Sequence, residues 1–397
     1  MNTKNSTPLS PCGRLAYLDW LRFLVVLSLA PFHAAISFTG MGSVYVYDTP
    51  VRDILLAGGT PVNIGPSVLS LFTIFLVNWF MHLLFFVSGI GAAFSLRKRN
   101  GAQFMGERCN RLLLPLIIST LLVVSFQTWL GALSFGRFSG GFLDFFPSFF
   151  TENFNMGQFW FLLYLFDFSA LALPLFLSIQ RKGEASRILS VARHFTAMPL
   201  LLLPALWTGF LEALFRPGWP GSFNPLNDWA IFTVYLSFFL AGYIAASVPE
   251  LLQAIEKHRL AALVFGVVAF LARMETYRVV AVPDGYNTAN IIAQAFRGIA
   301  AYGLVLAAIG YGQRYLNGPS RLLGIARDLS FPLYILHYAP VTAATYLLLN
   351  TGLSIWTKWF LIVAASWSFG AIFTFLARYV PLVRNFFGIR QLAVKTS

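Results

Sequence analysis

Long apolar segments, each about the length needed to cross a lipid bilayer, alternate with short polar stretches along the whole chain. An α-helix rises 1.5 Å per residue, so about 20 apolar residues span the hydrocarbon core. The pattern predicts ten such helices. They are Tyr17–Phe38, Val68–Leu96, Leu112–Leu130, Gln158–Ile179, Thr196–Phe215, Asp228–Val248, Leu260–Val280, Asn290–Gly310, Asp328–Leu349 and Ile355–Tyr379.

The seventh segment is the least regular of the ten. Its uninterrupted apolar run, Leu260–Ala272, is too short to cross a membrane unless the helix continues through Arg273 and Glu275. No loop or tail outside the ten segments is long enough to form a core of its own. The sequence therefore predicts an all-α integral membrane protein, with residues 1–397 forming one transmembrane domain and no separate soluble domain.

Composition and charge support this class. Only 11% of the 397 residues are charged and 57% are hydrophobic, whereas a soluble domain carries about 25% charged residues. The net charge of +13 does not indicate nucleic acid as a partner, because Lys and Arg gather in alternate loops. With a cytoplasmic N-terminus, the cytoplasmic segments carry 20 of the 28 Lys and Arg and the outer segments carry 6. Both termini are therefore predicted to be cytoplasmic, and the partner of the apolar surface is the bilayer.

Several other classes are not indicated. The polar start Met1–Gly13 and a first apolar run without a small-residue cleavage site argue against a cleaved signal peptide. Cys12 and Cys109 give neither a disulfide framework nor a metal-ligand spacing, and the sequence predicts no metal site. It also lacks a P-loop, a dinucleotide fingerprint and a nucleophile elbow.

Arg22 and His33 lie inside the first predicted helix. Eleven residues, just over three turns, separate them, so both side chains project from nearly the same face, roughly 16 Å apart along the axis. Ionisable groups at such depth are costly and mark a pathway or a reaction centre, and a histidine can act as a general base. Asp19, one turn before Arg22, can pair with it. A histidine that merely packs between helices is the alternative.

A basic pair precedes the third predicted span. In Glu107-Arg108-Cys-Asn-Arg111 the two arginines are three residues apart, so they are expected to share a face at a helix N-terminus. Two guanidinium groups at such an end suit a cofactor with several phosphates, such as coenzyme A. The alternative is ordinary positive-inside topology with contacts to lipid headgroups.

Four further ionisable residues fall inside predicted spans. They are His82, Asp167, Arg297 and His337. Each of them taken singly is compatible with a packing role. Together they predict a polar cavity inside the bundle, because each needs a polar partner in the bundle interior.

Five stretches resemble, in order and spacing, those of the integral-membrane acyltransferase family 3. They are Leu15-Ala-Tyr-Leu-Asp-Trp-Leu-Arg22 with His33 eleven positions beyond Arg22, Phe85-Phe-Val-Ser-Gly89, Arg108-x-x-Arg111, Trp160-Phe-Leu-Leu-Tyr164, and Ser330-Phe-Pro-Leu-Tyr-Ile-Leu-His337. One position departs from the family pattern. Gln158 stands where a histidine often precedes the Trp-Phe-Leu stretch, so no role of that histidine carries over.

The resemblance implies an enzyme of the bacterial inner membrane that moves an acyl group from cytoplasmic acyl-CoA to a hydroxyl of a periplasmic or cell-surface glycan. It implies catalytic roles for Arg22, His33 and His337, and cofactor binding by Arg108 and Arg111. Asp19 joins the predicted catalytic residues through its helical spacing, which lets it hold Arg22. The acyl group is expected to be acetyl or succinyl, and no metal is expected. A transporter or flippase of an anionic or glycosidic solute is the alternative function, and a scaffold without chemistry is a third.

Overall fold

The computed structural model describes residues 15–59, 65–219, 221, 223–318, 320–387 and 389, and within them all regular structure is helical. The α-helices are α1 (Ala16–Thr39), α2 (Thr49–Leu56), α3 (Ser67–Val77), α4 (Phe80–Leu96), α5 (Gly101–Arg108), α6 (Leu114–Ser119), α7 (Ser125–Ser134), α8 (Phe142–Thr151), α9 (Trp160–Lys182), α10 (Arg187–His194), α11 (Pro204–Phe215), α12 (Trp229–Ser247), α13 (Pro249–Lys257), α14 (Arg259–Val279), α15 (Thr288–Tyr315), α16 (Leu322–Leu336), α17 (Tyr338–Leu348), α18 (Ile355–Ala377) and α19 (Pro381–Phe387).

Within the described residues, eight helical stretches are long and apolar enough to cross a membrane. They are Ala16–Thr39, Ser67–Leu96, Gly101–Ser134, Gly157–Ala185, Trp229–Ser247, Arg259–Val279, Thr288–Tyr315 and Ile355–Ala377. The protein is thus an all-α integral membrane protein, as predicted. The doubtful seventh segment is a single helix, α14, which continues through Arg273 and Glu275.

The remaining two predicted spans take a different form. The fifth, Thr196–Phe215, contains only a short apolar helical stretch from Leu200 onwards. The ninth is divided at His337 into α16 and α17. Pro340 accounts for this break, because proline has no N–H to donate to the carbonyl of Leu336 and its ring crowds that carbonyl.

The third span begins earlier than the sequence indicated. The side chain of Asn100 accepts a hydrogen bond from the backbone N–H of Gln103, and the Gln103 side chain accepts one from the N–H of Asn100. This capping box starts α5 at Gly101, and the helical stretch continues to Ser134 with two π-helical turns, after α5 and after α6. The expectation that Arg108 and Arg111 stand at a helix N-terminus is therefore wrong.

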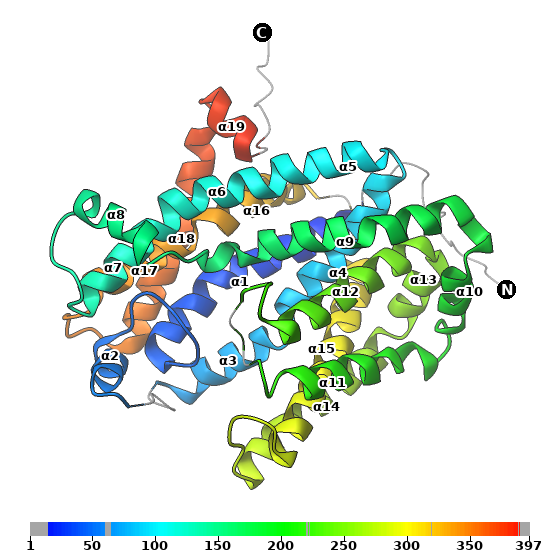
Figure 1. The fold of residues 1–397 in the computed structure, drawn as a ribbon, viewed down its shortest axis with the longest axis horizontal. Coiled ribbons are helices and arrows are strands. Elements are labelled where there is room, and N and C mark those ends of the chain that lie inside the picture. Colours follow the sequence, from blue (N-terminus) through cyan, green and yellow to red (C-terminus); the bar gives the residue numbers. More distant parts are fainter. Residues whose placement is uncertain are drawn as a thin grey trace.

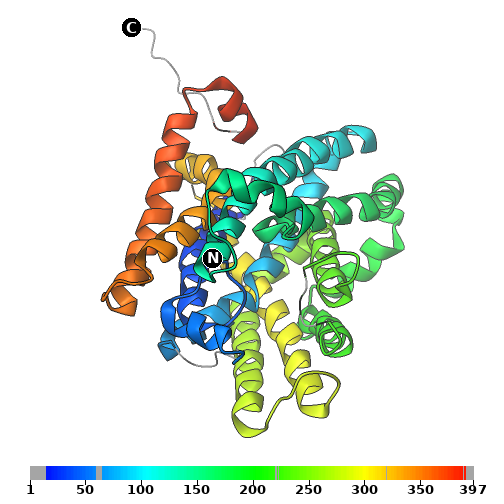
Figure 2. The same cartoon turned by 60° about the vertical axis from the view of Figure 1, so that its left-hand side comes forward.

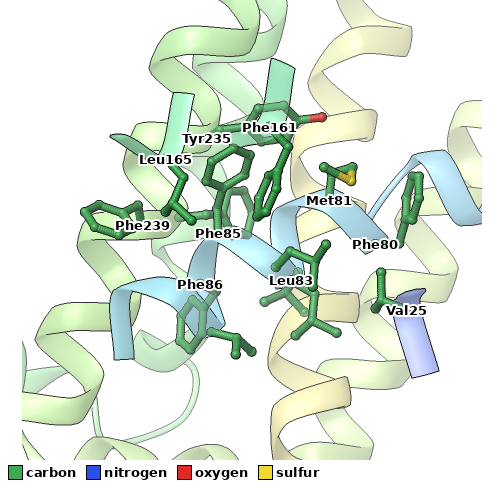
Figure 3. Close-up of a cluster of buried hydrophobic side chains, with 14 of the residues drawn as sticks. Val25, Phe80, Met81, Leu83, Phe85, Phe86, Phe161, Leu165, Tyr235 and Phe239 are labelled. Atoms are coloured by element: carbon green, nitrogen blue, oxygen red, sulfur yellow. The ribbon is translucent and has the colours of Figure 1, made fainter. Parts of the chain in front are cut away.

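The helix α4 lies at the centre of the hydrophobic core. Figure 3 shows Phe85 between Phe161 of α9 and Tyr235 of α12, and both ring centroids are 4.8 Å from that of Phe85. A Cβ atom at Gly89 would overlap the carbonyl oxygen of Phe239, and one at Gly242 would overlap that of Phe86. The two glycines therefore let the backbones of α4 and α12 touch.

The first helix runs through the middle of the bundle and connects its two halves (Figures 1 and 2). It packs against α3, α16, α17 and α18, and also against α4 and α15. A second group of helices is formed by α4, α11, α12, α14 and α15, whose closest neighbours are each other. Side chains of α1 therefore reach helices that are hundreds of residues away in the sequence.

Ion pairs between distant segments agree with the predicted alternation of sides. Lys358 Nζ lies 2.8 Å from Asp48 Oδ1, and the charge pattern assigns both residues to the outer side. Arg378 Nη2 lies 3.1 Å from Asp328 Oδ2, and both belong to the predicted cytoplasmic side. The absolute orientation of the bundle stays a prediction from the distribution of Lys and Arg.

Candidate functional site

Two of the sequence-predicted residues, His33 and His337, lie against each other inside the bundle. Their ring centroids are 5.3 Å apart and the ring planes differ by 30°. His33 comes from α1, and His337 occupies the break between α16 and α17. The ring of Tyr338 stacks on that of His33, and the two ring centroids are 4.0 Å apart. The broken helix therefore brings an imidazole and a phenol to the face of the α1 histidine.

The hydrogen bonds of His337 fix its tautomer. Its Nδ1 lies 2.8 Å from the carbonyl oxygen of Tyr334 and 3.0 Å from that of Leu333. Carbonyl oxygens only accept, so Nδ1 carries the proton and Nε2 is left with a lone pair. The Nε2 of His337 and the Nδ1 of His33 are both buried and have no hydrogen-bond partner among the described residues. Such atoms are rare in folded proteins and indicate a place where a substrate or water completes the site.

Aromatic and amide groups from the predicted outer loops border the histidine pair. The ring of Tyr45 lies 5.4 Å from that of Tyr338, and its hydroxyl donates to Asn155 Oδ1 at 2.8 Å. Burial raises the pKa of the Tyr45 phenol, so it stays a donor at neutral pH. Gly157 has φ +48°, and a Cβ there would lie 2.5 Å from the Tyr45 hydroxyl oxygen. Only glycine fits at this contact.

Gln158, the position that departs from the family pattern, lies in the same region. Its backbone carbonyl accepts a hydrogen bond from the Tyr334 hydroxyl at 3.0 Å, and Tyr334 precedes His337 by one turn. Both polar atoms of the Gln158 side chain are buried without a described partner. Sequence analysis gave this residue no role, and the structure places an unsatisfied amide close to the turn that carries His337.

Asp19 and Arg22 form a charged group nearer the predicted cytoplasmic end of α1. Asp19 Oδ1 lies 3.6 Å from Arg22 Nη1, which is the predicted pair. A closer contact was not predicted: Arg327 Nε of α16 lies 2.5 Å from Asp19 Oδ2. Arg22 Nη2 also donates to the carbonyl of Val87 at 3.4 Å. Asp19 therefore holds two guanidinium groups, and one comes from a residue 308 positions away.

The two arginines of the predicted phosphate site lie in different environments. Arg108 is half-buried, stacks on Phe104 with its guanidinium carbon 4.8 Å from the ring centroid, and is close enough to Arg22 for their charges to repel. Arg111 is 75% exposed and pairs with Glu107 at 3.2 Å. The π-helical turn that follows Arg108 breaks the α-helical spacing, and neither residue lies at a helix N-terminus. The charges of Arg22 and Arg111 both repel that of Arg108, but Arg111 is exposed whereas Arg108 is half-buried.

A second polar group lies in the other half of the bundle and contains two of the further residues flagged in the sequence, His82 and Arg297. Glu212 of α11 is fully buried there, and Arg216 holds it with Nε and Nη2 at 2.8 and 3.2 Å. Arg297 Nε lies 3.7 Å from the same carboxylate. The Glu212–Arg216 pair escaped the sequence analysis, although its four-residue spacing at the end of an apolar segment is a usable signal. Asp167 forms no ion pair with a described residue and is not part of this group.

Membrane-crossing helices that enclose a histidine pair and an arginine–aspartate group define a membrane-embedded protein with a buried polar site. Residues 15–378 match the family model of acyltransferase family 3, described as an acyltransferase domain, so the chain belongs to this family. The match includes every residue of the histidine pair and of the charged group around Asp19. Comparisons with curated proteins and with solved structures give no significant match. The protein is a multi-pass membrane acyltransferase.

Proposed function

We propose that this protein transfers an acetyl or succinyl group from cytoplasmic acyl-CoA to a hydroxyl of an extracytoplasmic glycan, in the bacterial inner membrane. The observation that carries the proposal is the stacked pair of His33 and His337 with two unpartnered ring nitrogens. Imidazole is the side chain best suited to move a proton near neutral pH. A buried pair with free nitrogens offers a place where a hydroxyl and a thioester can meet.

In this proposal His33 is the general base. It takes the proton of the acceptor hydroxyl as the hydroxyl oxygen attacks the thioester carbonyl carbon, and an ester bond forms while the carbon–sulfur bond breaks. The proton passes to the leaving thiolate, so the products are an O-acyl glycan and free coenzyme A. Positioned base catalysis of this kind contributes about 10²–10⁴-fold.

Tyr338 supports the charge that His33 acquires, and His337 packs against the same ring. The Nδ1 of His337 donates to backbone carbonyls, and the His337 ring stacks on that of His33. The face of the Tyr338 ring, 4.0 Å from the His33 ring, stabilises a cation by its quadrupole. The contact with Tyr338 therefore favours the protonated form of His33.

The donor phosphates are proposed to bind near Arg22 and Arg108. Both guanidinium groups lie toward the predicted cytoplasmic side, and their mutual repulsion is relieved by an anion between them. Arg22 and His33 belong to one unbroken helix and are roughly 16 Å apart along it. An extended acyl-CoA bound by its phosphates at the arginines directs its thioester toward the histidines. Arg111, which is exposed, is proposed to contact the same phosphates from the surface.

The acceptor is proposed to enter from the outer side, past Tyr45 and Asn155. Flat aromatic faces and amide groups are the chemistry that binds sugar rings and hydroxyls. The stretch Val380-Pro-Leu-Val-Arg-Asn-Phe-Phe-Gly388 resembles the corresponding part of glucans biosynthesis protein C, a succinyltransferase of periplasmic glucans, although Gly388 lies outside the described residues. This likeness favours a glucan acceptor and a succinyl group.

The direct test is mass analysis of extracytoplasmic glycans. Cells with the wild-type protein, cells without it and cells with His33→Ala are compared at equal protein level. We expect an added acetyl or succinyl mass only with the wild type. Identical glycan masses in all three strains would exclude O-acylation of a glycan as the function.

A further inference from the structure

A cluster of charged and polar side chains is buried between four helices, apart from the histidine pair. We call it the Glu212 cluster, and its members are His82 of α4, Glu212 of α11, Arg216, Arg273 of α14 and Arg297 of α15. Close packing holds it together, because a Cβ at Gly298 would overlap the carbonyl of Thr208 and so α11 and α15 touch one residue from Arg297. The proposed acyl transfer uses none of these residues.

The cluster carries more positive than negative charge. Three guanidinium groups are present, and Arg273 is close enough to Arg297 for their charges to repel. The carboxylates near them are Glu212 and Asp228, and Asp228 also accepts hydrogen bonds from the backbone N–H groups of Phe223 and Ile231. One positive charge is left in excess. An unbalanced charge within the membrane-spanning part of a protein is costly and points to a bound counter-ion or substrate.

Several polar atoms in the cluster have no hydrogen-bond partner among the described residues. Both ring nitrogens of His82 are unbonded although the residue is 1% exposed, and its ring is enclosed by Tyr235 and Phe238 at 4.8 and 4.9 Å. The Nε atoms of Arg273 and Arg297 are also buried without a hydrogen bond, although Arg297 Nε lies 3.7 Å from Glu212 Oε1 and Arg273 Nη1 donates to Asn78 Oδ1 at 3.5 Å. Leaving buried polar groups unpaired is costly, and more so for charged groups. A ligand with acceptor atoms would satisfy the guanidinium N–H groups and the single N–H of a neutral His82 ring.

A polar stripe leads to the cluster along α15. Asn290, Gln294 and Arg297 recur at spacings of four and three residues, so they share one helix face. Gln294 donates to Asn290 Oδ1 at 2.8 Å and to the Tyr277 hydroxyl at 3.4 Å. Asn290 lies in the first turn of α15, at the predicted outer end. The stripe therefore extends from the predicted outer end of α15 to Arg297, and Asn290 and Gln294 are themselves buried.

From these observations we infer that the Glu212 cluster is a binding site for a carboxylate. A guanidinium fork binds a carboxylate with two parallel hydrogen bonds, and the excess charge selects an anion over a cation or a neutral sugar. Such a carboxylate belongs either to a dicarboxylic acyl group or to an acidic substituent of the acceptor. The inference does not depend on His33 being a base.

Sodium succinate is the probe for the first experiment, with thermal unfolding of the detergent-solubilised protein as the readout. Succinate should raise the unfolding temperature above that in sodium chloride of equal ionic strength, and it should do so in His33→Ala as well. Arg297→Gln should weaken succinate binding about tenfold or more, because a charge-assisted contact is lost. Arg297→Lys keeps the charge without the planar fork, so its affinity for succinate should lie between those of the wild type and Arg297→Gln.

Arg278→Gln is the matched control, since Arg278 lies on α14 near Arg273 but is exposed and paired with Glu275. It should bind succinate like the wild type. Unfolding in chloride shows whether Arg297→Gln folds, and Arg273→Gln replaces it if it does not. Succinate stabilisation no greater than that by chloride, or equal in wild type and Arg297→Gln, would overturn the site. Tighter binding of phosphate than of succinate would overturn its assignment to a carboxylate.

Competition then identifies the source of the carboxylate. If it belongs to the acyl donor, succinyl-CoA displaces succinate and acetyl-CoA does not. If it belongs to the acceptor, an acidic oligosaccharide displaces succinate and the neutral oligosaccharide does not. Displacement by acetyl-CoA and by neutral sugar alike would contradict recognition of a carboxylate.

Discussion

The two buried polar centres of this bundle, the histidine pair and the Glu212 cluster, differ in how their polar groups are accommodated. The histidine pair contains no ion pair and is built from stacked rings at a point where a helix is broken by Pro340. The Glu212 cluster is built from charges on or next to α11, α14 and α15, and Glu212 is held there by a two-point contact with Arg216. Neutral groups with free nitrogens are suited to moving a proton, whereas fixed charges are suited to holding an ion.

The two centres should also differ in what their removal affects, activity or stability. Side chains of the histidine pair come from a helix break and touch mainly rings, so their removal should leave the surrounding helices in place. Glu212 faces two guanidinium groups, so its removal leaves buried positive charge without compensation. Substitutions in the histidine pair should therefore lower activity, and loss of Glu212 should lower stability.

The largest effect is expected for His33→Ala. Loss of the general base should lower acyl transfer about 10²–10⁴-fold, while expression, thermal unfolding and acyl-CoA binding stay close to those of the wild type. The measurement is the initial rate of ester formation by purified protein. His194→Ala serves as the control, because His194 is exposed and bonds only to the carbonyl of Ser190. More than about a tenth of wild-type activity in His33→Ala would be incompatible with the proposed role.

The next effect concerns stability. Glu212→Gln leaves Arg216 and Arg297 without their shared carboxylate, and breaking a buried pair in this way costs about 3–5 kcal/mol of folding free energy. Thermal unfolding in detergent is the measurement. Glu275→Gln is the matched control, because Glu275 pairs with Arg278 on the exposed side of α14 and surface pairs contribute little. Equal unfolding temperatures for the two variants would remove the distinction between the two centres.

Much of the fold could be predicted from the sequence, because crossing a bilayer demands long apolar helices. The predicted α1, α12, α14 and α18 differ from the observed helices by a few residues at most. The break at His337 was not predicted, since the apolar pattern continues through it and only the backbone shows the effect of Pro340. The start of the third span was missed because its basic residues were read as loop, whereas a capping box sets the boundary.

The candidate site was predictable in its residues but not in its partners. Helical spacing relates Asp19 to Arg22, because both lie on one helix, but it carries no information about Arg327, which approaches from α16. In the same way the sequence offered His33 and His337 separately, and only the packing of α1 against the broken helix brings their rings together. Contacts between distant segments depend on tertiary packing, which periodicity does not encode.

The smallest expected effect is a difference in acyl-CoA affinity between Arg108→Ala and Arg111→Ala. Arg108 is half-buried beside Arg22, so Arg108→Ala should weaken acyl-CoA binding by about 1.5–3 kcal/mol, or roughly ten- to a hundredfold. Arg111 is exposed and paired with Glu107, so Arg111→Ala should weaken it only about threefold or less. The measurement is thermal stabilisation by acetyl-CoA and succinyl-CoA across a concentration series.

Lysine substitutions sharpen the result. Arg108→Lys should recover only part of the affinity, because an ammonium keeps the charge but lacks the planar fork and its stacking on Phe104. Arg111→Lys should behave like the wild type, since an exposed charge that sets topology is equally well provided by lysine. If Arg108→Ala binds acyl-CoA as tightly as the wild type, the donor phosphates do not bind between Arg22 and Arg108. The proposed acyl transfer would then depend on the histidine pair alone for its structural support.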